Sequence, residues 1–131
     1  CLNNAAFGET GGHMTATSVI GQRTKSTLEG RTPGRHGYPI RLPEMLVGFE
    51  GVAYLARGTV HTPAGVKKTR KLLRAALETQ RRGLGFSLVE VVTMCPTGWF
   101  VTPGEGPKFQ QENLLPVFPV GELKRPRDLT A

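Results

Sequence analysis

Residues 52–93 have the sequence pattern of two strands joined by a helix. The segment Val52-Ala53-Tyr54-Leu55-Ala56 is mostly apolar, as expected of a strand buried on both faces. A helix is predicted over residues 64–82, because Thr62-Pro63 is a start signal and Gly83 stands where a helix cap is expected. Residues 86–93 are rich in β-branched side chains and predict a second strand. Short connections then make a right-handed strand–helix–strand unit in a parallel sheet, so the predicted fold class is α/β.

The predicted helix is amphipathic. Its apolar side chains recur at helical spacing, which predicts that they pack on the sheet: Val66, Leu73 and Leu77, with Leu72 and Ala76 beside them. Its charged side chains form the opposite face: Lys67, Lys71, Arg74, Glu78 and Arg81. A basic face of this kind is either simply solvated or available to an acidic partner.

A glycine-rich loop follows the first residues of the chain. Cys1-Leu2 is typical of the end of a buried strand, and Asn3-Asn4 precedes a loop that contains three glycines. Asparagine oxygens are hard neutral ligands suited to Mg²⁺, and glycines let the backbone approach a phosphate closely. Open α/β sheets bind ligands just beyond the carboxyl end of a strand. An ordinary turn has the same composition, so these residues alone leave both interpretations open.

Four motifs occur in one order along the chain. They are Asn3-Asn4-x-x-Phe7-Gly8-x-Thr10-Gly11-Gly12, Gly21-Gln22-Arg23-Thr24, His36-Gly37-Tyr38-Pro39-Ile40 and Cys95-Pro96-Thr97-x-Trp99. Together they resemble the β subunit of the 2-oxoacid:ferredoxin oxidoreductases, the subunit that carries thiamine diphosphate. The resemblance is closest to the 2-oxoglutarate group. It extends from residue 3 to about residue 102, and faintly over residues 119–124.

The resemblance covers only part of such a subunit, so we expect a C-terminal fragment of one. Residues 1–102 would be the C-terminal part of a doubly wound, parallel-sheet thiamine-diphosphate-binding domain. Residues 103–131 would be a Pro/Gly-rich C-terminal extension that runs over the surface. Because earlier strands would then be missing, we expect the chain alone to fold poorly.

The resemblance also implies an activity. The complete enzyme would oxidatively decarboxylate a 2-oxoacid, in the first place 2-oxoglutarate, to its acyl-CoA and pass the electrons to ferredoxin. The implied cofactors are thiamine diphosphate, Mg²⁺ and a 4Fe-4S cluster. The implied partners are an α subunit, with γ and δ subunits in some assemblies, together with ferredoxin, coenzyme A and the 2-oxoacid. The acid that activates the aminopyrimidine comes from a partner subunit in this family, so no catalytic residue is predicted in this chain.

The same resemblance assigns the candidate site residues. The Asn4 side chain and the Ala6 backbone carbonyl would bind Mg²⁺. The predicted cofactor-binding residues are Asn4, Ala6, Phe7, Gly8, Glu9, Thr10 and Gly11. Glu9 and His13 depart from the family pattern, and an acid beside a diphosphate is unfavourable unless it points away or meets a cation.

Cys95 is the candidate iron–sulfur ligand. It directly follows an apolar strand and precedes Pro96. The resemblance matches it to the fourth thiolate of a 4Fe-4S cluster, whose other three cysteines would lie near the start of the complete subunit. A small buried hydrophobic residue is the alternative reading of a free cysteine in this place.

Composition limits the classes of function that this chain can have. The 131-residue chain has a net charge of +7 and two cysteines, which make no disulfide framework. No apolar run is long enough to span a membrane and no signal peptide is visible, so a cytoplasmic protein is expected. Nucleic-acid binding is not predicted, because no aromatic residues are interleaved with the basic ones. Two alternatives stay open: a non-redox thiamine-diphosphate decarboxylase or synthase, and a small basic binding module.

Overall fold

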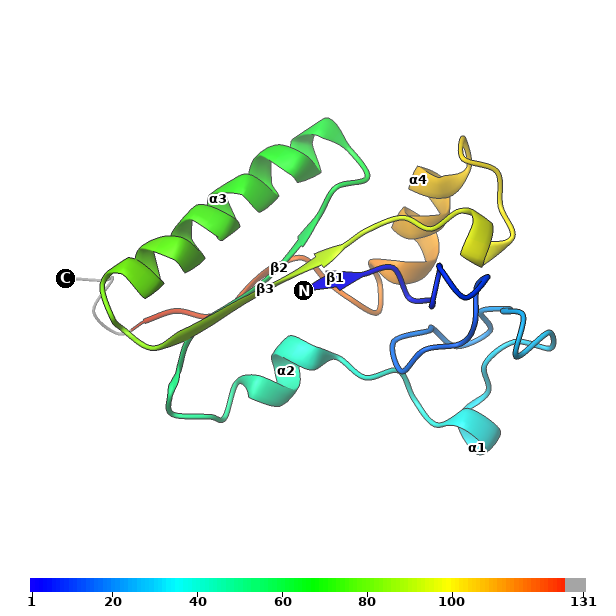
Figure 1. The fold of residues 1–131 in the computed structure, drawn as a ribbon, viewed down its shortest axis with the longest axis horizontal. Coiled ribbons are helices and arrows are strands. Elements are labelled where there is room, and N and C mark those ends of the chain that lie inside the picture. Colours follow the sequence, from blue (N-terminus) through cyan, green and yellow to red (C-terminus); the bar gives the residue numbers. More distant parts are fainter. Residues whose placement is uncertain (127–131) are drawn as a thin grey trace.

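The computed structural model describes residues 1–126 and has a mixed α/β fold (Figure 1). In chain order its elements are β1 (Leu2–Asn3), α1 (Pro33–His36), α2 (Leu42–Leu46), β2 (Val52–Thr59), α3 (Pro63–Arg81), β3 (Phe86–Val92), a 3₁₀ turn (Thr97–Trp99), α4 (Gly106–Phe109), a π-helical turn (Gln110–Leu114) and β4 (Gly121–Lys124). The sheet order is β1-β3-β2-β4. The strands β1, β3 and β2 are parallel, and β4 is antiparallel to β2. Figure 1 shows α3 over one face of the sheet and α2 under the other.

The predicted strand–helix–strand unit is confirmed as β2, α3 and β3. Every residue of β2 is buried, as the apolar pattern indicated. The helix α3 begins with Thr62 as its N-cap, whose hydroxyl accepts a hydrogen bond from the Gly65 amide at 3.1 Å. The parallel register pairs Arg57 of β2 with Glu90 of β3.

The predicted buried stripe of α3 is confirmed for Ala76, which is buried, and for Leu72, which packs against the core, and is wrong for its other three residues. Val66, Leu73 and Leu77 are 39%, 42% and 70% exposed. The buried residues of the helix are Gly65, Thr69, Ala76 and Thr79. Small side chains occupy the face because the helix lies very close to β2: the Thr69 hydroxyl exchanges hydrogen bonds with the Thr59 amide and carbonyl, both at 2.8 Å. The face of α3 that packs on the sheet is therefore determined by the small size of its side chains more than by their apolar character.

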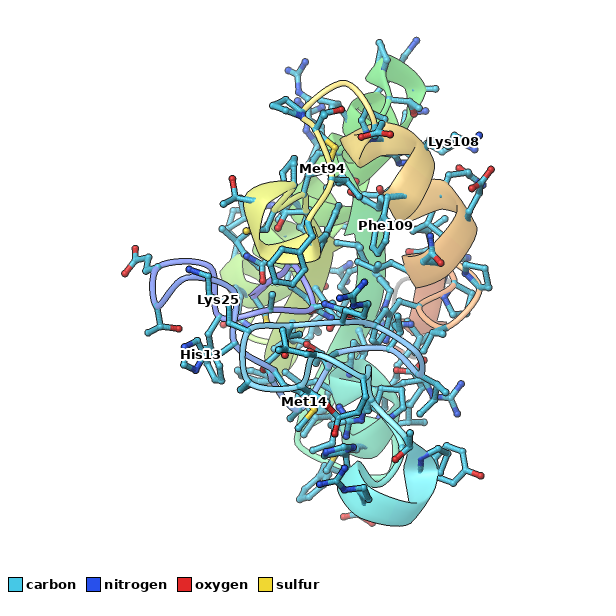
Figure 2. All side chains as sticks on the ribbon, turned by 90° about the vertical axis from the view of Figure 1, so that its right-hand side faces the viewer. His13, Met14, Lys25, Met94, Lys108 and Phe109 are labelled. Carbon is cyan, nitrogen blue, oxygen red and sulfur yellow. The ribbon has the colours of Figure 1, made fainter. Side chains whose placement is uncertain are left out.

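The expected surface tail after residue 102 is also wrong for the described residues. Leu114 and Phe118 are completely buried and pack in one core cluster with Ala5, Val92 and Trp99. The reason is local: residues 106–114 form helical turns, and these bring the scattered apolar side chains onto one side. Figure 2 shows Phe109 pointing inward from α4, where it stacks on Trp99 at 4.9 Å, while Lys108 points outward. The last residues of the predicted extension, 127–131, lie outside the described residues.

The long loop between β1 and α2 is held together by Arg31. This buried side chain donates hydrogen bonds to six backbone carbonyls: those of Thr15, Ala16, Ser18, His36, Gly37 and Tyr38. The loop contains one short helix, α1. One polar side chain thus replaces the regular backbone pairing that the loop lacks.

Within residues 1–126, none of the helices combines the length and the apolar character that crossing a membrane requires.

Candidate functional site

The candidate site lies where β1 ends. A pocket of about 400 Å³ opens there. Its lining includes most of the predicted cofactor-binding residues: Leu2, Asn3, Asn4, Ala6, Phe7, Gly8, Glu9, Thr10, Thr15 and Thr17. Because β1 is parallel to β3, the pocket sits beyond the carboxyl end of a parallel strand, where α/β sheets commonly bind ligands.

Two consecutive asparagine turns shape the floor of this pocket. The Asn3 side-chain oxygen accepts a hydrogen bond from the Ala5 amide at 3.0 Å, and the Asn4 oxygen accepts one from the Ala6 amide at 3.1 Å. Ala5 is held at a φ of 56°, in the left-handed region that non-glycine residues seldom adopt. The turn therefore has a defined, slightly strained shape that its neighbours must maintain.

The neighbours fix one carbonyl of the turn and leave another available. The Ala5 carbonyl accepts hydrogen bonds from the Ser18 hydroxyl and the Gln22 amide, both at 2.7 Å. Among residues 1–126, no donor reaches the Ala6 carbonyl. The Asn4 oxygen, which uses one lone pair for the Ala6 amide, keeps a second. Two hard neutral oxygens at the pocket are a donor set that fits Mg²⁺.

Glycines let the following loop pack tightly. The Gly12 amide donates to the Phe7 carbonyl at 3.0 Å, which closes the loop. A Cβ on Gly12 would lie 2.9 Å from the Gly98 Cα, and Gly12 has a φ of 89°. A Cβ on Gly8 would lie 3.0 Å from the Cys95 Sγ. The loop therefore rests directly on the segment that contains Cys95.

The structure thus brings the two predicted metal-binding regions together. Cys95 is half-buried, carries a free thiol and packs beside the core cluster of Trp99 and Phe118. The Trp99 indole N–H donates to the Asn4 carbonyl at 2.7 Å and ties the two regions to each other. Within residues 1–126, no group of three or more His, Cys, Asp or Glu side chains is placed to hold a metal.

Glu9, His13 and Lys25 lie on the outside of the loop. Glu9 is exposed at the rim of the pocket and forms no ion pair with the described residues. A Cβ on Gly11 would lie 2.9 Å from the Lys25 Nζ, so the ammonium group rests against the loop. Figure 2 shows Lys25 and His13 on neighbouring loops. Lys25 was not among the predicted site residues, because it lies outside the four motifs and local sequence does not indicate which loop it reaches.

A buried charge cluster beneath the site was not predicted either. Arg57 is fully buried and donates to Glu90 at 2.5 Å and to Glu44 at 2.6 and 2.9 Å. Burial lowers the pKa of Arg57, but its hydrogen bonds to the two carboxylates outweigh this and raise the pKa. Glu90 also accepts a hydrogen bond from the Asn3 side chain at 2.9 Å. The available signal was a charged residue in each of two otherwise apolar strands.

Comparison with known proteins finds similar subunits of a ketoisovalerate oxidoreductase and of a 2-oxoglutarate synthase. The ketoisovalerate oxidoreductase subunit VorA of Methanothermobacter thermautotrophicus is 33% identical over 123 residues, which are 94% of this chain and 26% of that protein. The 2-oxoglutarate synthase subunit KorB of Archaeoglobus fulgidus is 32% identical over 112 residues, which are 86% of this chain and 38% of that protein. The chain therefore spans between about a quarter and two-fifths of these relatives. No family model matches the chain, and no solved structure matches it significantly.

Proposed function

This chain belongs to the 2-oxoacid:ferredoxin oxidoreductase subunits, as its relatives VorA and KorB indicate, and we propose that it forms part of a thiamine diphosphate site. The observation that carries the proposal is the turn at residues 4–6, which offers the Asn4 and Ala6 oxygens to a pocket at the end of β1. The Asn4 side chain and the Ala6 carbonyl would hold Mg²⁺. The cofactor's diphosphate would supply further oxygens to the ion.

The loop of residues 7–11 would surround the diphosphate. Gly8 contributes backbone without a side chain to the pocket lining, while Phe7 adds an apolar wall. Lys25 supports the proposal with a positive charge beside Gly11. Glu9 is exposed, so its carboxylate can remain in solvent at the rim. These residues would bind and orient the cofactor. When bound, thiamine diphosphate itself supplies the electron sink for decarboxylation.

Cys95 is proposed as one thiolate ligand of a 4Fe-4S cluster. Its sulfur lies against Gly8, so a cluster bound there would be next to the cofactor loop. Four thiolates hold such a cluster, and the other three would come from outside residues 1–126. The position supports a short path for electrons from the site toward ferredoxin.

The proposed reaction is oxidative decarboxylation of a 2-oxoacid to its acyl-CoA, with an α subunit, coenzyme A and ferredoxin as partners. The motifs favour 2-oxoglutarate, whereas the VorA relatives are named for ketoisovalerate and match a larger share of the chain. Steady-state kinetics of the complete enzyme with both acids would identify the substrate. A higher kcat/KM for ketoisovalerate would overturn the 2-oxoglutarate proposal and leave the 2-oxoacid class intact.

Asn4→Ala tests the cofactor site. The substitution removes one proposed Mg²⁺ ligand and the hydrogen bond to the Ala6 amide, so the affinity for Mg²⁺–thiamine diphosphate should fall by about tenfold or more. Calorimetric titration of the complete enzyme measures this affinity. Asn113→Ala is the matched control, because Asn113 is exposed on the π-helical turn and distant from the pocket lining. Equal affinities for the two variants would refute the assignment of Asn4.

A further inference from the structure

The buried charge cluster joins β1, β2, β3 and α2 under the candidate site. Arg57 of β2 forms ion pairs with Glu90 of β3 and with Glu44 of α2. It also donates to the Pro119 carbonyl at 3.2 Å, and its guanidinium lies 5.5 Å from the centre of the Phe118 ring. Burying charges is costly, and apolar residues of similar size often stabilise a fold at least as well. A contribution to stability therefore does not by itself explain why these charges are buried here.

Glu90 links this cluster to the site. Its two carboxylate oxygens have different partners: one accepts from Arg57, and the other accepts from the Asn3 side-chain amide at 2.9 Å. The Asn3 amide group must therefore direct its nitrogen toward Glu90 and its oxygen the other way. That oxygen accepts hydrogen bonds from the Ala5 amide at 3.0 Å and the Thr17 hydroxyl at 2.8 Å.

The orientation of Asn3 determines the shape of the turn. Its oxygen holds Ala5 in the left-handed conformation, and the second asparagine turn at Asn4 starts from there. If the Glu90 carboxylate were displaced, the Asn3 amide could rotate and present its nitrogen to the Ala5 amide, which cannot accept a hydrogen bond. The turn would then lose the contact that maintains its strained residue.

We propose that Arg57 is a positioning residue for the cofactor clamp, acting through Glu90 and Asn3 on the backbone of residues 4–6. The proposal rests on the proposed function, because the clamp itself is part of it. Arg57 suits the role since its planar group contacts Glu90 with one edge and Glu44 with another. A lysine would keep the charge but could not hold both carboxylates in this geometry.

The test is a double-mutant cycle in the complete enzyme, with Arg57→Lys, Asn3→Ala and the double variant. Each single substitution should weaken binding of Mg²⁺–thiamine diphosphate by about 10–100-fold, as measured by calorimetry. The double variant should bind no more weakly than Asn3→Ala, because Arg57 acts through Asn3. Unchanged affinity of Arg57→Lys, or additive losses in the double variant, would overturn the proposal. Ala76→Gly is the control, since it destabilises α3 away from the cluster and should leave the affinity unchanged.

A second measurement separates this inference from the proposed function. If Asn4→Ala leaves the affinity unchanged, the cofactor assignment fails, and the coupling is read instead from the Trp99 indole N–H, which donates to the Asn4 carbonyl at 2.7 Å. Its NMR resonance, assigned with Trp99→Phe, should move in Arg57→Lys and stay in place in Ala76→Gly. An unmoved resonance in Arg57→Lys would refute the positioning role. If Arg57→Lys does not fold, Glu90→Gln replaces it with the same expected and contradicting results.

Discussion

Glu44 is the residue whose ionisation ties α2 to the buried charge cluster. Burial raises its pKa, but the hydrogen bonds and the positive charge of Arg57 more than offset this, and the pKa of Glu44 is lowered. A carboxyl group with a lowered folded-state pKa stabilises the fold above its unfolded value, about 4.3 for a glutamate. That contribution is lost as the pH falls through the lower folded-state pKa.

Glu44→Gln should therefore destabilise the protein in a pH-dependent manner. At pH 7 the loss of two charge-assisted hydrogen bonds should cost about 1.5–3 kcal/mol. As the pH falls below about 4 the wild-type protein loses the same contribution, so the difference in Tm should shrink. Thermal unfolding across this range measures it. Glu112→Gln serves as the control, because Glu112 is exposed and faces Lys108 at 3.9 Å; a difference for Glu44→Gln that stays constant with pH would contradict the prediction.

At the residue scale, the sequence indicated candidate residues for the site but not the residues that support them. Asn4, Gly8 and Cys95 were predicted as site residues through the family resemblance, and in the structure Gly8 lies between the other two. The pairing of Arg57 with Glu90 was not predicted, because the first predicted strand ends at residue 56 and leaves Arg57 outside it. Their partners also lie far away in the sequence: Asn3 and Glu90 are 87 residues apart. Such contacts depend on strand order, which no local pattern contains.

At the scale of elements, the packing of α3 on β2 depends on Gly58 and Thr69. The sequence predicted the limits of this helix within one residue at each end, from its cap and its length. It predicted the buried face only in part, because apolar spacing also favoured Val66, Leu73 and Leu77, which are exposed. The sequence pattern does not contain the distance between the helix and the sheet. Small residues on both elements determine that distance.

Gly58→Ala tests this account of the packing. A Cβ on Gly58 would lie 2.3 Å from the Thr69 hydroxyl oxygen and 2.8 Å from its methyl carbon, so the helix or the strand must move. We expect a loss of about 1–3 kcal/mol in the free energy of unfolding, as for other overpacked cores. Denaturant titration measures this loss. Gly104→Ala has no atom within 4 Å of its added Cβ and should leave stability unchanged. Similar stabilities of the two variants would mean that the close contact does not control the packing.

At the scale of the whole molecule, one core joins three distant parts of the chain. Ala5 and Ala6 of the candidate site pack with Val92, Trp99, Leu114 and Phe118. The segment after residue 102, expected on the surface, thus supports the floor of the pocket from behind. Because Cys95 packs against this same group of core residues, the proposed cofactor loop and the proposed iron–sulfur ligand share one support. Electron transfer out of the site would depend on that arrangement and on the other subunits of the enzyme.

Cys95→Ser in the complete enzyme, purified without oxygen, distinguishes the redox from the non-redox thiamine-diphosphate enzyme. A buried cysteine without a ligand role should tolerate the change with a modest loss of stability. If Cys95 is a cluster thiolate, iron content and ferredoxin reduction should both fall by most of their value, while calorimetry still detects thiamine diphosphate binding. Cys1→Ser is the control, because Cys1 is an exposed free thiol, and it should retain its iron. Full iron content with normal ferredoxin reduction in Cys95→Ser would leave this residue a packing thiol and favour a decarboxylase or synthase.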